Sequence, residues 1–138
     1  MTNLNSKDFG RHYIEVIWNQ AQLDKLAELT APDIVRHDPV SGVQRGFEEY
    51  SAVVHALHAA FHPMHFTINQ QVGEGDTAAH HWTVTGTHVG EFNGIAATGK
   101  QFTLDGIGIY RVADGKLVEE RTVWDALGLL KQLDLMNG

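Results

Sequence analysis

Apolar residues recur at intervals of three and four over roughly the first 61 positions of the chain, the period of an α-helix that buries one face. A first helix is expected to begin near Ser6, and one stripe of its surface consists of Phe9, Tyr13, Val16, Ile17 and Gln20. A shorter second helix around residues 23–31 should end at Pro32, because the residue before a proline resists the α conformation. After a turn-rich stretch at 33–46, a third helix is predicted from about Phe47 to Phe61.

Beyond His62 the period of the apolar residues changes from 3.6 to 2, which is typical of strands. Four strands are predicted, at residues 64–76, 77–92, 100–116 and 117–125, and Asp114-Gly115 is a tight hairpin signal between the last two. Helices followed by consecutive strands indicate an α+β domain: a curved mixed or antiparallel sheet with three N-terminal helices and a short C-terminal helix. A bent sheet closed by helices leaves a concave pocket, which is where such a domain would bind a ligand.

The composition and net charge of the chain indicate how many domains it forms and which classes of partner to expect. The 138 residues fit a single domain, 1–138, and 43% of them are hydrophobic, as in an ordinary globular protein. Because the formal net charge is -7 and the ten Lys and Arg residues are scattered, we expect no nucleic-acid partner. Apolar runs are too short for a membrane span and the first ten residues lack a signal-peptide core, so we expect no membrane partner and a cytoplasmic location.

The segment "TVWDALGLLKQLDL", residues 122–135, places a carboxylate where the last strand meets an apolar helical pattern. Asp125 directly precedes that pattern, and aspartate is a favoured helix N-cap, worth about 1 kcal/mol. The alternative is a chemical role in the pocket. Strict alternation would put Leu117, Glu119, Arg121, Val123 and Asp125 on one face of the strand, so Arg121 would share the face of Asp125.

Three segments together carry a resemblance to a known family: "GTHVGEFNGIAATGK" (86–100), "GIGIYRVADGKLVEE" (106–120) and "WDALGLLKQL" (124–133). With the earlier "HDPV" loop, they resemble the SnoaL-like polyketide cyclases, or ester cyclases, of the NTF2-like superfamily. The resemblance covers nearly the whole chain and implies an NTF2-like cone fold. It further implies an intramolecular aldol condensation of a polyketide methyl ester without metal or organic cofactor. The residue that it implies as the acid/base group is Asp125.

One departure from the family pattern concerns Arg121. Where these cyclases tend to have "EHW" in the last strand, this chain has Glu119, Glu120 and Arg121. An arginine beside Asp125 could form a structural ion pair and keep the pKa of Asp125 low. Arg121 could instead bind a substrate carboxylate or stabilise an enolate oxygen.

Two histidines are further candidates for the pocket. His37, in the loop after the second helix, could orient a substrate or move a proton at the cavity mouth, or could belong to a turn in which Asp38 bonds the local backbone. His80 and His81 are consecutive in a strand and must point to opposite faces, so His81 is included as a substrate-binding candidate although alternation does not decide which face is concave.

Large aromatic side chains supply the predicted pocket wall. Trp18, on the first helix, and Phe92, beside a glycine-rich turn, are expected to line it, and Trp124 is a further substrate-binding candidate. An apolar wall with few polar groups suits a flat, hydrophobic ligand.

Neither a metal nor a phosphate site is expected. His55, His58 and His62 could share one helix face, but the carboxylate of an HExxH-like arrangement is missing. The glycines of "GEFNGIAATG" fit neither a P-loop nor a dinucleotide fingerprint.

Two classes of function therefore remain. The first is a cofactor-independent enzyme that uses acid/base catalysis by Asp125, Arg121 and His37 on an apolar carbonyl or ester substrate, by aldol-type cyclisation or by related lyase, isomerase or hydrolase chemistry. The second is a non-enzymatic binding module for a small apolar ligand. In either case we expect a homodimer or homotetramer, because an exposed sheet face in a small cone can pack against a second copy.

Overall fold

The computed structural model describes residues 4–136 and begins with the predicted first helix. Helix α1 spans Ser6–Tyr13 and continues as a π-helical turn, Ile14–Asn19. The side chain of Asn5 caps its N-terminus by accepting a hydrogen bond from the backbone N–H of Asp8, at 2.8 Å. Its apolar face is buried, with Tyr13 and Ile17 fully enclosed.

The second helix is shorter than predicted, and the stretch after it is not merely turn-rich. A 3-10 turn at Leu23–Lys25 leads into α2, Leu26–Leu29, and strand β1 then occupies Thr30–Asp38. Strand β2, Gly42–Arg45, pairs antiparallel with β1. The expected end of the helix at Pro32 was wrong because the chain is already extended at Thr30, and Pro32 lies inside β1.

The third helix and the long strands follow the periodicity closely. Helix α3 spans Phe47–Ala60 and passes directly into β3, Phe61–Glu74. Strands β4, Thr77–His88, β5, Gln101–Ala113, and β6, Lys116–Trp124, come next. Helix α4, Ala126–Gln132, is the short C-terminal helix.

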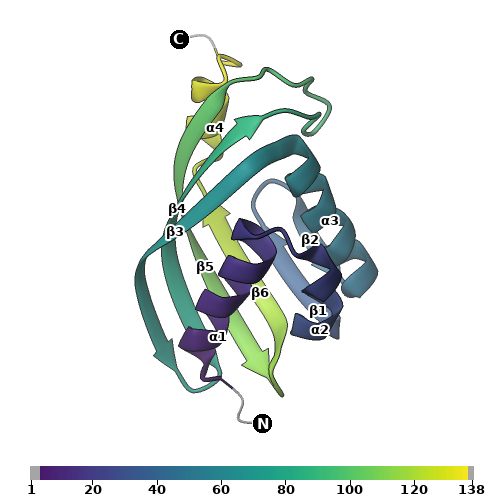
Figure 1. The fold of residues 1–138 in the computed structure, drawn as a ribbon, viewed down its shortest axis with the longest axis vertical. Coiled ribbons are helices and arrows are strands. Elements are labelled where there is room, and N and C mark those ends of the chain that lie inside the picture. The colour runs from purple at the N-terminus through teal and green to yellow at the C-terminus, as the bar shows by residue number, and fades with distance from the viewer. Residues whose placement is uncertain (1–3, 137–138) are drawn as a thin grey trace.

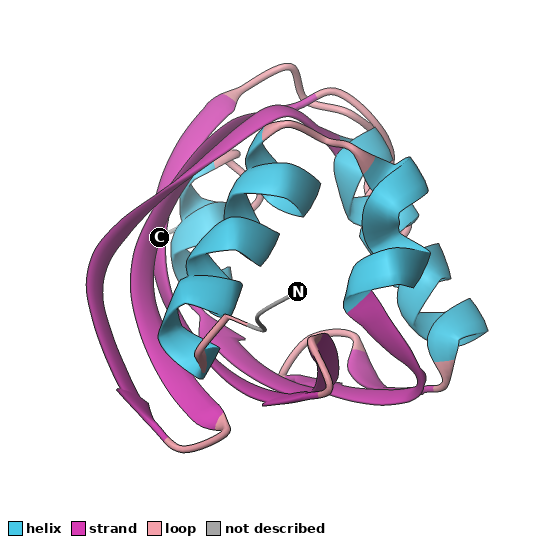
Figure 2. Cartoon of the chain, turned by 60° about the horizontal axis from the view of Figure 1, so that its bottom comes forward, coloured by secondary structure: helices cyan, strands magenta, loops and turns pink. Residues whose placement is uncertain are grey.

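The strands form one sheet in the order β2-β1-β6-β5-β4-β3. Neighbours pair antiparallel except β1 and β6, which are parallel, so the sheet is mixed. It curves around α1 and α3, which lie on its concave side (Figures 1 and 2). The structure thus has the curved α+β architecture that the sequence predicted, and its sheet is not closed into a barrel. Among the described residues no helix is long and apolar enough to cross a membrane.

Strand β6 departs from simple alternation at one point that matters for the site. Val112 pairs with Leu117, but Arg111 pairs with Glu119, so Val118 is an extra residue in β6. The bulge changes the phase of the strand: Leu117 is buried, and the next buried side chain is Glu120 rather than Glu119. The prediction that residues 117, 119, 121, 123 and 125 share one face was therefore wrong.

Candidate active site

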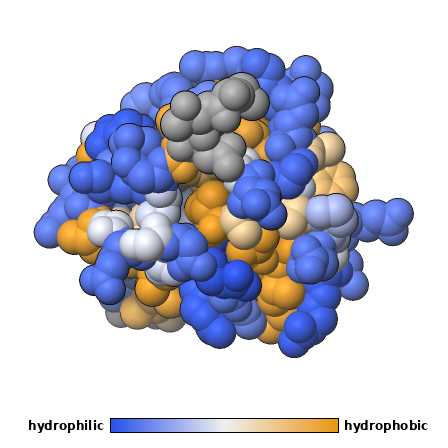
Figure 3. Space-filling model, turned by 90° about the horizontal axis from the view of Figure 1, so that it is seen from below, coloured by the Kyte–Doolittle hydropathy of each residue, from blue (hydrophilic) through white to orange (hydrophobic). Residues whose placement is uncertain are grey.

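A cavity of about 190 Å³ lies between the concave face of the sheet and the helices. Seen from the end nearest the described N-terminus, hydrophobic side chains are visible near the centre, among hydrophilic ones (Figure 3). The apolar residues that line the cavity come from the π-helical turn, α3, four of the strands, the adjoining loops and α4. They are Ile14, Trp18, Val40, Val53, Ala56, Leu57, Phe61, Met64, Phe66, Trp82, Val84, Phe92, Phe102, Leu104, Trp124 and Leu129.

Part of the cavity lining is strongly polar, at the end of β1, where Asp38 lies. One carboxylate oxygen, Oδ2, accepts hydrogen bonds from Nη2 of Arg36 at 2.8 Å and from Nε1 of Trp124 at 3.1 Å. The other, Oδ1, accepts from the backbone N–H groups of Val40 at 2.7 Å and Ser41 at 3.0 Å. The side chain of Asp38 is only 4% exposed, so these four donors compensate its burial.

Those donors determine the charge of Asp38. Burial by itself would raise the pKa of its carboxyl group. The backbone N–H of Ser41, the Arg36 guanidinium, the N–H of Val40 and the Trp124 indole outweigh burial and hold the pKa below its usual value. Asp38 is therefore ionised at neutral pH and lines the cavity as a carboxylate.

A second buried carboxylate, Glu120, adjoins Asp38 through Arg36. Nε of Arg36 donates to Oε2 of Glu120 at 3.2 Å, and the hydroxyl of Tyr50 donates to Oε1 at 3.1 Å. Tyr13 shares a hydrogen bond with Tyr50 and extends this network into the core. Burial would lower the pKa of Arg36, but Glu120 and Asp38 outweigh it and raise that pKa, so the guanidinium stays charged.

Three of the predicted substrate-binding residues line the cavity: Trp18, Phe92 and Trp124. Trp18 is held by a stacked contact with His58, with ring centroids 5.0 Å apart. Phe92 packs against Phe61 at a centroid distance of 5.0 Å. Whether these residues bind a substrate stays a prediction, but their placement at the cavity agrees with it.

Asp125 lies at the junction that the sequence indicated, outside the cavity lining. It is the N-cap of α4, and its Oδ1 accepts the backbone N–H of Gly128 at 2.8 Å. The structure thus establishes the capping contact, while a chemical role for Asp125 stays a prediction. Nη2 of Arg121 lies 3.9 Å from Oε2 of Glu119 on the exposed side of the sheet, and no ion pair with Asp125 is among the contacts of residues 4–136.

His37 and His81 also lie away from the cavity lining. Nε2 of His37 is 3.3 Å from Oε2 of Glu119, and Nε2 of His81 is 3.6 Å from Oδ2 of Asp105. In β1 and β4 it is the neighbouring residues, Arg36 and His80, whose side chains are buried on the concave side. The structure therefore brings none of Asp125, Arg121, His37 and His81 into the cavity lining.

Sequence reasoning missed the buried pair of Asp38 and Glu120. The expected turn was correct as far as it went, because Asp38 does bond the backbone at residues 40 and 41. One signal was available: Arg36 and Asp38 are two residues apart, which is the spacing of neighbours on one strand face. The signal is weak because residues 33–46 have the composition of a turn-rich stretch, although they form β1 and β2.

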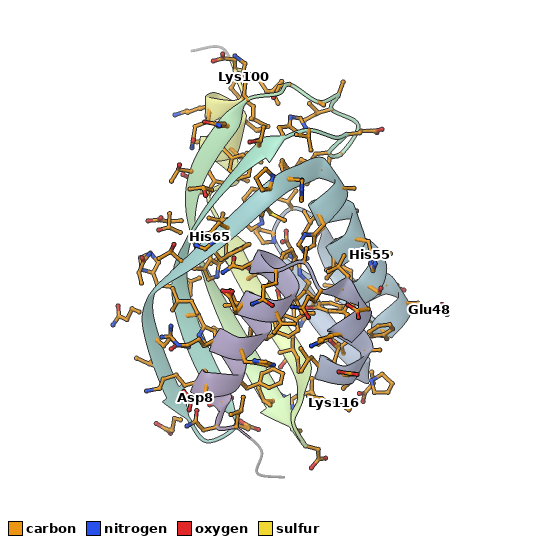
Figure 4. The ribbon with its side chains drawn as sticks, in the orientation of Figure 1. Asp8, Glu48, His55, His65, Lys100 and Lys116 are labelled. Atoms are coloured by element: carbon orange, nitrogen blue, oxygen red, sulfur yellow. The ribbon has the colours of Figure 1, made fainter. Side chains whose placement is uncertain are left out.

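The histidines of α3 do not converge on a metal site. His55 is exposed and points away from the sheet (Figure 4). His58 instead packs against Trp18. Burial lowers the pKa of His58, so its ring is neutral. No group of three or more His, Cys, Asp or Glu side chains among residues 4–136 is arranged to hold a metal ion.

Comparison with known proteins identifies relatives over almost the full chain. A family model described as SnoaL-like polyketide cyclase matches residues 8–133. Aklanonic acid methyl ester cyclase DnrD of Streptomyces peucetius is 30% identical over 132 residues, which cover 91% of this chain and 88% of that protein.

Solved structures agree with this match. IdmH of Streptomyces antibioticus, a candidate polyketide cyclase, is 32% identical, with a TM-score of 0.82 over 95% of this chain and 99% of its own. A protein of ketosteroid isomerase-like fold from Catenulispora acidiphila has a TM-score of 0.79 over 96% of each chain at 17% identity, which shows the fold alone. The expected NTF2-like fold is confirmed.

Proposed function

The chain belongs to the SnoaL-like polyketide cyclase family, and from this premise we propose that it is an enzyme that works without a cofactor, by acid/base chemistry on a neutral carbonyl or ester compound. The favoured reaction is an aldol-type ring closure, and the relative DnrD, which is named as a methyl ester cyclase, supports a ring closure. We further propose that the acid/base group is Asp38 rather than Asp125.

One observation carries the choice of Asp38: it is an ionised carboxylate at the wall of a mostly apolar cavity. A hydrogen between two carbonyl groups is already acidic, so a base of modest strength is enough if it is positioned and shielded from water. Its contacts with Arg36 and Trp124 keep the carboxylate in one orientation, which favours proton transfer in a fixed geometry.

The proposed step balances without an outside reagent. Asp38 takes a proton from the carbon between two carbonyls, and the electron pair of that C–H bond moves into an enolate. The enolate carbon then attacks a second carbonyl carbon of the same molecule and forms a C–C bond. The resulting alkoxide takes back the proton from Asp38, so the product is a cyclic isomer of the substrate.

The charges around the cavity support a neutral substrate. Three carboxylates, those of Asp38, Glu91 and Glu120, line it together with one guanidinium, that of Arg36. Because Arg36 already bonds both Asp38 and Glu120, it is not available to bind an anionic ligand. A methyl ester should therefore enter more readily than the corresponding free acid.

The test is proton exchange at a substrate carbon. Methyl benzoylacetate in D2O, followed by proton NMR, reports how fast the protein removes the hydrogens at the carbon between its two carbonyls. We expect Asp38→Asn to slow this exchange about 10²- to 10⁴-fold, the usual contribution of a general base. Circular dichroism and thermal unfolding verify that the variant is folded.

Asp125→Asn is the matched comparison, because asparagine keeps an oxygen to cap α4 and removes the charge. We expect it to leave the exchange rate unchanged. If Asp125→Asn abolishes exchange and folded Asp38→Asn does not, the base is Asp125 and the choice of Asp38 is wrong.

A binding module remains the second candidate, and one observation favours it. Both oxygens of Asp38 are already occupied by donors, and its low pKa makes it a weaker base. Under this alternative the protein binds methyl benzoylacetate in titrations of tryptophan fluorescence but exchanges its hydrogens no faster than buffer.

A further inference from the structure

Two glycines of β5, Gly106 and Gly108, differ in what lies above them. A Cβ atom at Gly106 would overlap the indole ring of Trp82, so Trp82 fills that space. At Gly108 the nearest atoms to such a Cβ would be Cε1 of Tyr110 at 3.4 Å and Nε1 of Trp82 at 3.6 Å. Gly108 lines the cavity, so the missing side chain leaves a small hollow in the cavity floor.

Three side chains that carry hydrogen-bond donors lie next to this hollow. The indole nitrogen of Trp82 and the ring edge of Tyr110 are the side-chain atoms nearest to it, and Thr122 is the residue of β6 that pairs with Gly108. Trp82 has an indole N–H, and Tyr110 and Thr122 each have a hydroxyl. All three side chains are buried and line the cavity. None of these three groups has a hydrogen-bond partner among residues 4–136, and none is sealed from the cavity like the orphaned Nε2 of His80.

Because these donors are unpaired within the described chain and open to the cavity, they can bind an acceptor that enters it. The required acceptor is compact and lies against backbone, because only the absence of a side chain at Gly108 makes room for it. A carbonyl oxygen matches this description, and the apolar walls suit the rest of such a molecule.

The hollow also lies at a suitable place relative to Asp38. Arg36 pairs with Glu120 and His37 with Arg121, so Asp38 and Thr122 both lie one residue further along neighbouring strands. Thr122 in turn pairs with Gly108. With strands about 4.8 Å apart, the backbones at Asp38 and Gly108 are separated by roughly 10 Å, and a molecule with two carbonyl groups can reach both places.

We propose that the hollow at Gly108 is a subsite for a substrate carbonyl oxygen, with Thr122, Tyr110 and Trp82 as the hydrogen-bond donors that stabilise the oxygen when it becomes an enolate. This catalytic part rests on the proposed function. As the proton leaves carbon for the carboxylate, the electron pair moves onto this oxygen, and donors that already lie beside it stabilise the new charge. Burial and the nearby Glu120 raise the pKa of Tyr110, which keeps its hydroxyl protonated as a donor.

Binding can test the subsite independently of turnover. The probes are benzoylacetone, a neutral 1,3-diketone, and n-butylbenzene, which has the same carbon skeleton without the oxygens. Thr122→Val and Tyr110→Phe each remove one hydroxyl and keep the shape of the side chain. We expect each variant to bind benzoylacetone about three- to tenfold more weakly, as the loss of one hydrogen bond would predict. The affinity for n-butylbenzene should not change.

Two further variants serve as controls for shape and for substitution as such. Gly108→Ala adds a methyl group that meets only ordinary van der Waals contacts, so the protein should fold. The methyl group fills the hollow, so the affinity for benzoylacetone should fall. Thr85→Val, at an exposed position of β4, should change the affinity for neither ligand. If Thr122→Val and Tyr110→Phe lower the affinity for both ligands equally, or for neither ligand, the proposed subsite is wrong.

The exchange assay separates this inference from the choice of base. We expect Thr122→Val and Tyr110→Phe to slow exchange of methyl benzoylacetate by up to about a hundredfold. If Asp38→Asn abolishes exchange but the hydroxyl variants lose neither affinity nor rate, the subsite is wrong and the proposed function stands. If the hydroxyl variants bind only benzoylacetone more weakly, while Asp38→Asn catalyses hydrogen exchange at the wild-type rate, the subsite stands and the base lies elsewhere.

Discussion

At the scale of single residues, burial acts on Asp38 and His80 with opposite outcomes. Asp38 is buried with four donors and stays charged. His80 is fully buried with one bond, in which Nε2 of Gln71 donates to Nδ1 of His80 at 2.9 Å, while its own Nε2 has no partner among the described residues. Desolvation, with a contribution from Arg11, lowers the pKa of His80 to about 4, so its ring is neutral in the folded protein.

His80 therefore makes stability depend on pH. Its pKa is lower in the folded chain than the usual 6.5, so the unfolded chain binds more protons. The free energy of unfolding should fall as the pH drops from about 6.5 to about 4, by up to about 3 kcal/mol from this residue. Urea unfolding at pH 7 and pH 4.5 measures the loss. His80→Gln, whatever its stability at pH 7, should show a smaller loss; an equal loss would assign the pH dependence to other groups.

The aromatic cavity residues were predictable individually, whereas the polar ones were not. Trp18, Phe92 and Trp124 were expected from their size and from the elements that carry them, and all three line the cavity. For Asp38 the sequence indicates only a place in a turn. Its second role depends on Arg36 and on Trp124, which is 86 positions away in the sequence.

At the scale of elements, α1 approaches β4 closely because Gly10 has no side chain. A Cβ atom there would overlap the imidazole ring of His80, which lies directly against the helix. The glycine at this point of a helix is therefore a packing requirement and not a break in the helix.

Gly10→Ala should consequently destabilise the protein by about 1 to 3 kcal/mol, the usual cost of overpacking a core. The sign of the change in the free energy of unfolding distinguishes a clash from free space, because Gly→Ala in an open part of a helix stabilises the helix by up to about 1 kcal/mol. Thermal or urea unfolding measures the effect. In the double variant Gly10→Ala, His80→Ala the clash is gone, so the two losses should not add; additive losses would show that His80 is not the obstacle.

The boundaries of elements were predictable where the period of the apolar residues was long and regular. Helix α3 and strands β3 to β5 agree closely with their patterns. Strands β1 and β2 were missed because a short pair interrupted by Pro39 and Gly42 looks like a loop in the sequence. The bulge at Val118 was missed because one inserted residue changes the face of every residue after it.

At the scale of the whole molecule, the curved sheet uses its concave face for the cavity and leaves its other face exposed. Three apolar side chains lie there on adjacent strands: Ile107, Ile109 and Val123, the last of them 58% exposed. Ile107 and Val123 are paired across β5 and β6, so they form one continuous patch. Such a patch favours contact with another protein surface.

We expect this patch to pair two copies of the chain, in line with the homodimer expected from the sequence. Light scattering on a size-exclusion column should give twice the mass of the chain for the wild type and the single mass for Ile107→Glu. Val72→Glu, at an exposed position of β3, is the matched control and should stay dimeric. A wild-type protein that is monomeric at high concentration would contradict the expectation.

The sequence by itself determined the α+β class, most helices and strands, the family, and the aromatic wall of the cavity. These features depend on local periodicity, on residue size and on a long matching pattern, all of which are written along the chain. Only the tertiary structure decided which face of each strand is concave, and hence which polar groups meet there. Asp125, prominent in the sequence, caps a helix outside the cavity lining, while Asp38, Glu120 and the hollow at Gly108 depend on a strand bulge and on pairings between distant segments.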